Sequence, residues 1–286
     1  MPESKRPELV ALEARLANTL DELREAAAER RRARGYRTAR ENLADLVDPE
    51  SFVEYGQLAV AAQRNRRDYE DLQVQTAADG VITGVGRVNG HRTAVAVYDY
   101  SVLAGTQGYF HHKKLDRIFE LAEDWELPMV MYTEGGGGRP GDTDVTTQIA
   151  GLAIKSFSTW AKLSGLVPRI AVNNGYCFAG NAALFGCADI TIATRSSWIG
   201  MAGPAMIEGG GLGVHEPTAI GPIEVQERNG VVDIVAQDEA HATALAKQLL
   251  GYFQGPAADW ECGDQAGLRE AVPEDRRWGY PVSYTH

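Results

Sequence analysis

The stretch from Val172 to Thr194, VNNGYCFAGNAALFGCADITIAT, has the composition of a binding site built from backbone groups. Its apolar start predicts a strand, Gly175 marks a tight turn, and small residues around Ala179 and Gly180 predict a helix start. Such a turn presents N–H groups that stabilise negative charge, for example the oxyanion of a thioester enolate. The N–H groups of Ala179 and Gly180 are the candidate catalytic donors. Close packing of a helix on a sheet would explain the same small residues, so both interpretations stay open.

A second stretch, Glu134-Gly135-Gly136-Gly137-Gly138-Arg139, follows an apolar strand predicted over residues 128–133. It is too rich in glycine for regular structure, and a loop of this kind at the carboxyl end of a strand lets a ligand approach the backbone closely. Gly135, Gly136, Gly137 and Gly138 are therefore predicted to line a pocket, with a flexible surface loop as the alternative. We expect Glu134 to brace this loop by accepting backbone hydrogen bonds; a general base is the other reading of Glu134.

Other reactive side chains give weaker signals. Cys177 lacks a neighbouring base and an orienting carboxylate, so a buried structural cysteine is the preferred interpretation. His111 and His112 are adjacent and point apart on a helix, which makes them a poor metal pair. No metal site is predicted.

The elements that would position these groups follow an α/β order. Leucines at three- and four-residue spacing predict one helix from about residue 3 to residue 34, whose leucine face could pack on the body or on a partner. The turn Asn89-Gly90 predicts a hairpin between strands 80–88 and 92–99. The further expected elements are helices over 109–123, 147–163 and 239–252 and strands over 189–194 and 230–235.

Length and charge limit the class of protein. The chain has 286 residues, which is enough for a sizeable core, and its net charge of −11 argues against a nucleic-acid binder. Three cysteines without paired spacing, no long apolar run and no signal-peptide pattern predict a cytoplasmic protein that does not span a membrane. We expect a helical extension over residues 1–40, a main domain over 41–255 and a linker-like tail over 256–286.

Six landmarks in this order resemble the N-terminal half of the β-type carboxyltransferase of biotin-dependent acyl-CoA carboxylases, a branch of the crotonase superfamily. They are an entry segment, a first core strand, the helix after a glycine loop, the Glu-Gly-Gly-Gly-Gly-Arg loop, the oxyanion turn and a late Gly-x-x-Asp segment. In this chain the six lie at residues 35–54, 79–84, 109–123, 134–139, 175–182 and 229–240. The resemblance implies a crotonase-like α/β fold of repeated ββα units with an N-terminal helical extension.

The resemblance also implies the chemistry. The chain would bind acyl-CoA of the acetyl- or propionyl-CoA type and stabilise its enolate at Ala179 and Gly180 for carboxylation by carboxybiotin, which a separate carrier protein holds. Lys113, Lys114, Arg117 and Arg139 become candidates for the CoA phosphates, although each could also be a solvated surface charge. A complementary C-terminal half, the biotin carboxyl carrier protein and biotin carboxylase are the implied partners in an oligomer.

Departures from the family keep alternatives open. Ala179 replaces a glycine of the family, Gln226 stands where many members have a histidine, and the second half is absent from the sequence. A biotin-independent hydratase, isomerase or decarboxylase that uses Glu134 or Glu208 is one alternative. A non-catalytic scaffold subunit is the other.

Overall fold

The computed structural model describes residues 5–145, 154–255 and 261–270. Met1–Phe253 form one compact unit and Gln254–His286 form a second, in which a short 3-10 helix, Ala266–Arg269, is described. The finer division at residues 40 and 255 stays a prediction. Within the described ranges, no helix has both the length and the apolar character needed to cross a membrane.

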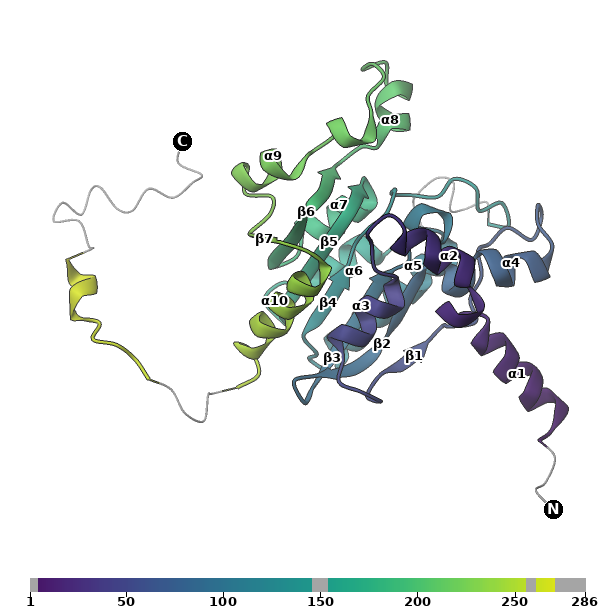
Figure 1. Ribbon diagram of the computed structural model, residues 1–286, viewed down its shortest axis with the longest axis horizontal. Helices are drawn as coiled ribbons and strands as arrows, with labels where there is room; N and C mark the ends of the chain where they lie inside the picture. Colours follow the sequence, from purple (N-terminus) through teal and green to yellow (C-terminus); the bar gives the residue numbers. More distant parts are fainter. Residues whose placement is uncertain (1–4, 146–153, 256–260, 271–286) are drawn as a thin grey trace. The chain divides into compact units, whose positions relative to one another are not determined.

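A seven-stranded sheet organises the first unit, and its strands lie side by side in chain order (Figure 1). Strands β1, β2 and β3 pair antiparallel, and β3 through β7 are parallel. The Asn89–Gly90 turn joins β2 to β3, which confirms the predicted hairpin. The strands are β1 Val53–Tyr55, β2 Val81–Val88, β3 His91–Tyr98, β4 Met129–Tyr132, β5 Arg169–Phe178, β6 Ile190–Gly200 and β7 Ile234–Ala236.

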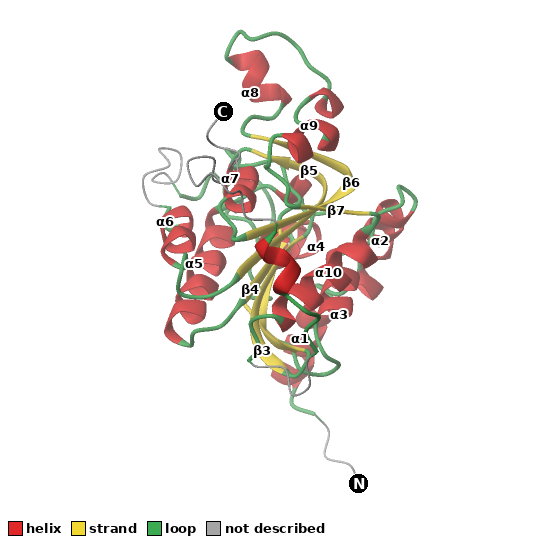
Figure 2. Cartoon of the chain, turned by 90° about the vertical axis from the view of Figure 1, so that its left-hand side faces the viewer, coloured by secondary structure: helices red, strands yellow, loops and turns green. Residues whose placement is uncertain are grey.

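Helices cover both faces of the sheet (Figures 1 and 2). One face carries α3 (Ala39–Leu46) and α10 (Glu239–Gly251). The opposite face carries α5 (Tyr109–Asp124), α6 (Ser156–Lys162) and α7 (Gly180–Gly186).

Neighbouring strand residues divide between the two layers because side chains alternate across a strand. Val95 and Val130 pack under α3 and α10, whereas Ala94 and Met129 pack under α5 and α6. Full burial of an aliphatic side chain of this size contributes about 1.5–3 kcal/mol, so these two layers are the main source of stability.

The N-terminal segment differs from its prediction. The single helix expected from residue 3 to residue 34 is two helices, α1 (Pro7–Ala17) and α2 (Glu25–Arg32), separated by a 3-10 turn. Thr19 lies in the break, and its hydroxyl donates to the Leu16 carbonyl at 2.7 Å. Such a side-chain bond competes with the backbone hydrogen bonds that would continue the helix. A capping box between Thr38 and Glu41 then starts α3.

Several other boundaries also move. β5 continues through Gly175, where a turn was predicted, and β6 runs six residues beyond the predicted end at Thr194. Of the helix predicted over 147–163, α6 is described, while residues 147–153 lie outside the described ranges. Three further short helices lie outside these layers: α4 Tyr69–Gln75, α8 Pro204–Gly209 and α9 Ile223–Arg228.

Candidate functional site

Three loops meet at the carboxyl ends of β3, β4 and β5. They are residues 103–108 after β3, residues 134–139 after β4 (the glycine loop) and residues 179–181 after β5 (the α7 turn). Because parallel strands end at one edge of the sheet, loops that are far apart in sequence become neighbours there.

Backbone hydrogen bonds join the glycine loop to the loop after β3. Gly136 N–H donates to the Ala104 carbonyl at 3.0 Å, and Gln107 N–H donates to the Gly137 carbonyl at 2.7 Å. Arg139 N–H donates to the Gln107 carbonyl at 2.9 Å. Gly138 lies between the Gly137 carbonyl and the Arg139 N–H, which both bond to Gln107. In a parallel bridge of this kind, the N–H of the middle residue points away from the partner, so Gly138 N–H points away from the loop after β3.

The glycine loop is also joined to β5 and to the α7 turn. Gly135 N–H donates to the Tyr176 carbonyl at 2.7 Å and its carbonyl accepts from Phe178 N–H at 2.9 Å. Gly137 N–H donates to Asn181 Oδ1 at 3.0 Å. The sequence-predicted residues Gly135, Gly136, Gly137, Gly138 and Arg139 are therefore brought together with Ala179 and Gly180 in one assembly.

Close approach explains two of the glycines. A Cβ on Gly135 would lie 2.2 Å from the Gly105 carbonyl oxygen and 2.3 Å from Asn181 Nδ2. A Cβ on Gly137 would lie 2.7 Å from the Ala179 methyl group, and its φ of +89° favours glycine as well. Backbone groups, rather than side chains, therefore form this part of the site.

The α7 turn corrects one prediction. Ala179 has φ 52° and ψ −118°, an unusual conformation for alanine, and its N–H donates to the Gly200 carbonyl at 2.9 Å. This donor is engaged in the sheet and is not available to a ligand. Among the described residues, no backbone hydrogen bond uses the N–H of Gly180. The turn thus retains one of the two predicted donors.

The four predicted phosphate-binding cations fall into two classes. Lys114 is buried, and its ammonium group donates to the carbonyls of Ala78 and Val81. Arg139 is buried too and forms an ion pair with Asp79 at 2.6 Å. Both are structural cations, so neither is placed to contact a phosphate.

The other two cations remain on the surface of α5. The Lys113 ammonium lies 5.4 Å from the centre of the Tyr109 ring. Arg117 pairs loosely with Glu120 at 3.7 Å. Only these two of the four keep the exposure that a phosphate contact requires.

Glu134 is not held as predicted. Its carboxylate is bound by the guanidinium of Arg31 from α2, with Nη1 to Oε1 at 3.0 Å and Nη2 to Oε2 at 2.7 Å. Burial raises the pKa of Glu134 to about 7, even though Arg31 opposes the shift. No pattern in the sequence pairs these two residues. The one available signal was the need of a buried glutamate for a cation, together with the arginines at positions 30–34.

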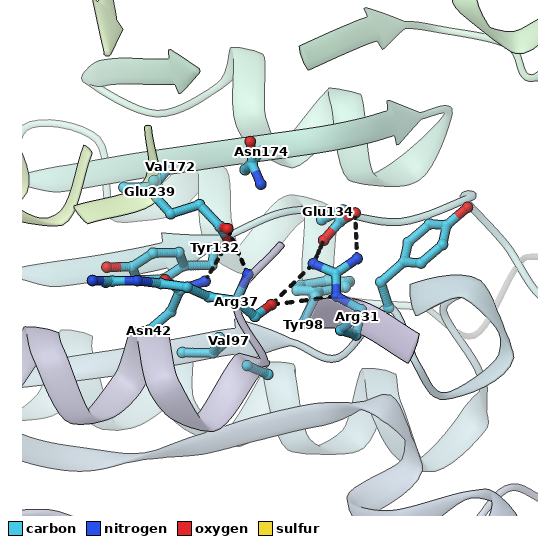
Figure 3. Close-up of a pocket in the computed structure, with 12 residues that line it drawn as sticks. Arg31, Arg37, Asn42, Val97, Tyr98, Tyr132, Glu134, Val172, Asn174 and Glu239 are labelled. Carbon is cyan, nitrogen blue, oxygen red and sulfur yellow. Dashed lines mark hydrogen bonds and ion pairs between the residues drawn. The ribbon is translucent and has the colours of Figure 1, made fainter. Parts of the chain in front are cut away.

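Arg31 and Glu134 both line a small cavity (Figure 3). This cavity of about 20 Å³, large enough for one water molecule, lies between Glu134, Asn42 and Glu239. A wider surface pocket of about 410 Å³ shares Glu239 with it and is lined by Arg34, Tyr36, Ser196 and Gln237, among others.

The remaining reactive side chains, Cys177 and His112, are buried in the interior. Cys177 is fully buried, and burial raises the pKa of its thiol to about 12, so it remains protonated. His112 is buried beside Ser156 at 2.9 Å, and burial lowers its pKa to about 4. Within the described ranges, no group of three or more His, Cys, Asp and Glu side chains could hold a metal ion.

Curated proteins are similar to this chain in sequence over most of its length. The chain is 30% identical to the methylmalonyl-CoA carboxyltransferase 12S subunit of Propionibacterium freudenreichii subsp. shermanii, over 90% of this chain and 50% of that protein. It is 30% identical to the propionyl-CoA carboxylase beta chain of Saccharopolyspora erythraea, over 80% of this chain and 41% of that protein. The chain therefore spans about half the length of these relatives.

Solved structures agree. A single-chain, multi-domain long-chain acyl-CoA carboxylase superposes with a TM-score of 0.86 at 54% identity, over 96% of this chain and 28% of that one. One chain of the transcarboxylase 12S structure superposes with a TM-score of 0.75 at 26% identity, over 95% of this chain and 54% of that one. The predicted crotonase-like α/β fold is thereby confirmed. The family model of the carboxyl transferase domain matches residues 30–283, and the chain belongs to this family.

Proposed function

We propose that this chain is the acyl-CoA-binding part of a carboxyltransferase in a biotin-dependent acyl-CoA carboxylase. The convergence of the glycine loop and the α7 turn beside Gly180 is the observation that supports this most directly. There, two backbone amides remain for a ligand, Gly180 N–H and Gly138 N–H, which no backbone hydrogen bond between described residues engages.

The proposed chemistry follows from the weak acidity of a thioester α-proton. Removal of this proton places negative charge on the thioester oxygen, and backbone donors aimed at that oxygen lower the barrier. A single donor of this kind is worth roughly 2.7–4 kcal/mol in comparable enzymes. Gly180 N–H and Gly138 N–H would bind and orient the thioester. Carboxybiotin on a separate carrier protein would supply the carboxyl group.

Phosphate recognition and assembly belong to the same proposal. Lys113 and Arg117 are the remaining candidates for the CoA phosphates, because they are exposed on α5, the helix that follows the loop after β3. The partners would be a complementary carboxyltransferase half, a biotin carboxyl carrier protein and biotin carboxylase, within a cytoplasmic oligomer. The chain matches about half the length of the two relatives, and the proposed complementary half corresponds to the part of them that it does not match.

Calorimetry of acyl-CoA binding tests the proposal. The panel is acetyl-CoA, propionyl-CoA, a long-chain acyl-CoA and free CoA, the long chain being included because of the 54% identical structure. The test variant is Gly180→Pro, which removes the N–H, and its matched control is Gly180→Ala, which keeps it. Both variants add a Cβ that would lie 2.3 Å from Gln107 Oε1. The difference in affinity between the two variants therefore isolates the contribution of the N–H donor.

We expect the wild-type chain to bind an acyl-CoA more tightly than free CoA, and this preference to be lost in Gly180→Pro but not in Gly180→Ala. Equal binding of all ligands, or no binding, by the wild-type chain would overturn the proposal and favour a scaffold role. The binding of Glu134 to Arg31 gives no support to a biotin-independent enzyme with Glu134 as its base.

A further inference from the structure

The glycine loop begins at a buried carboxylate that depends on one side chain of the N-terminal segment. Arg31 reaches from α2 to the carboxyl ends of β4 and β5 and binds Glu134 with both terminal nitrogens. Such a forked contact fixes the direction of the carboxylate as well as its charge. The next residue, Gly135, is the first residue of the loop that hydrogen-bonds to β5.

Other contacts hold Arg31 in place. Its guanidinium lies 4.8 Å from the centre of the Tyr36 ring and 5.6 Å from that of Tyr100. It also donates to the Arg37 carbonyl, at 3.3 Å from Nε and 3.2 Å from Nη2. The side chain is 10% exposed, so most of its stem and head is withdrawn from water. Figure 3 shows the Arg31 guanidinium facing the Glu134 carboxylate, with dashed lines for the two hydrogen bonds between them.

The carboxylate is seated against β5 on its other side. A Cβ on Gly175 would lie 2.4 Å from Glu134 Oε1, and Gly175 has φ +91°. At this point the pairing of β5 with β6 also shifts its register. The missing side chain at Gly175 therefore leaves the space that the Glu134 carboxylate occupies.

We propose that Arg31 is a positioning residue for the glycine loop: it holds the Glu134 carboxylate against β5 and so fixes the backbone donors that follow. The consequence for acyl-CoA rests on the proposed function above. The consequence for the loop itself does not, because it follows from the contacts of Arg31, Glu134 and Gly175 alone.

The pair is also sensitive to pH. Because burial raises the pKa of Glu134 to about 7, the closed site disfavours the ionised carboxylate, and a rise of pH through 7 favours opening of the loop even though Arg31 opposes the shift. The loop should therefore be held more firmly at pH 6 than at pH 8. The titratable and charged groups that face Glu134 are Arg31 from α2, Tyr36 after α2, Asp99 and Tyr100 after β3, Cys177 from β5 and Glu239 from α10.

Hydrogen–deuterium exchange of the full-length chain tests this proposal. The amides of the glycine loop would be followed in the wild type, Arg31→Met and Arg31→Lys, with the β2–β3 hairpin amides as an internal reference for folding. Arg24→Met is the matched control: Arg24 anchors the same segment through Asp99 at 2.7 Å but does not contact Glu134. Rates would be corrected for the intrinsic effect of pH.

We expect exchange of the loop to rise about tenfold in Arg31→Met and less in Arg31→Lys, with the hairpin unchanged. We also expect loop protection in the wild type to fall from pH 6 to pH 8, and this fall to be absent in Glu134→Gln. The proposal would be overturned if the glycine-loop amides of Arg31→Met exchanged at the wild-type rate. It would also be overturned if Arg24→Met raised their exchange as much as Arg31→Met does.

Acyl-CoA binding by the same variants adds a separate readout. Arg31→Met should weaken the binding of acyl-CoA and leave that of free CoA unchanged. If the wild-type chain binds no acyl-CoA, the proposed function fails, while the exchange data still decide the role of Arg31.

Discussion

The two ends of the glycine loop are both held by buried ion pairs, but the pairs differ in kind. At the carboxyl end, Arg139 binds Asp79 at 2.6 Å and Asp142 at 3.5 Å, so one guanidinium serves two carboxylates of the main body. At the amino end, Glu134 has one close cationic partner among the described residues, Arg31 on the N-terminal segment.

The difference shows how a loop made of backbone donors can be rigid at one end and adjustable at the other. Asp79 is fully buried and also accepts from His111 N–H at 2.7 Å, which ties that end of the loop to α5. Glu134 depends on α2, whose other links to the rest of the unit include the ion pairs Arg24–Asp99 and Arg32–Glu41. The ionisation of Glu134 near neutral pH adds a second way to loosen the amino end.

The largest effect should come from Arg139→Met. It leaves Asp79 and Asp142 buried without their cation, which costs roughly 3–5 kcal/mol in the free energy of unfolding. Urea unfolding measures this loss, with Arg117→Met as the control, because an exposed pair at 3.7 Å contributes about 0–1 kcal/mol. A loss for Arg139→Met no greater than that of the control would contradict the assignment of a rigid end.

A smaller and pH-dependent loss should follow Arg31→Met. The folded-state pKa of Glu134 is raised to about 7 from an ordinary 4.5, so its ionisation opposes folding as pH rises through that window. Without Arg31 the pKa rises further, and the variant should lose about 1–3 kcal/mol at pH 8 but less at pH 6. Urea unfolding at the two pH values measures the difference. A loss of unfolding free energy that is larger at pH 6 than at pH 8 would contradict the assignment of an adjustable, pH-sensitive amino end.

The smallest effect on stability should come from Gly138→Ala, between the two ends. A Cβ at this position meets nothing within 4 Å, so the free energy of unfolding should change by less than about 0.5 kcal/mol. Its methyl group would stand beside a proposed donor, so acyl-CoA affinity should fall about tenfold while free CoA is unaffected. Calorimetry and urea unfolding together measure this. Unchanged acyl-CoA affinity would remove Gly138 from the site.

Much of the fold is visible in local sequence patterns. The Asn89–Gly90 hairpin, α5 and the glycine loop after β4 were all predicted where they occur, because turn chemistry, helical periodicity and glycine content act locally. The helix break near Thr19 was missed because the leucine spacing continues across it.

The site was harder to predict because its details depend on distant partners. Gly175 looked like a turn, but it is a glycine because Glu134 occupies the space beside it. Lys114 looked like a surface cation, but its ammonium group donates to the carbonyls of Ala78, just before β2, and Val81, the first residue of β2. The link between Arg31 and Glu134 spans 103 positions, so no window of sequence contains both.

The contact between Ala179 and Gly137 has a consequence for how this site can vary. The Ala179 methyl group occupies the place that a side chain on Gly137 would need, 2.7 Å from its Cβ position. The two positions therefore share room for one methyl group, and substitutions at them are not independent. In a relative with a glycine in place of Ala179, the space beside Gly137 is free. The residue types at the two positions should therefore co-vary among relatives.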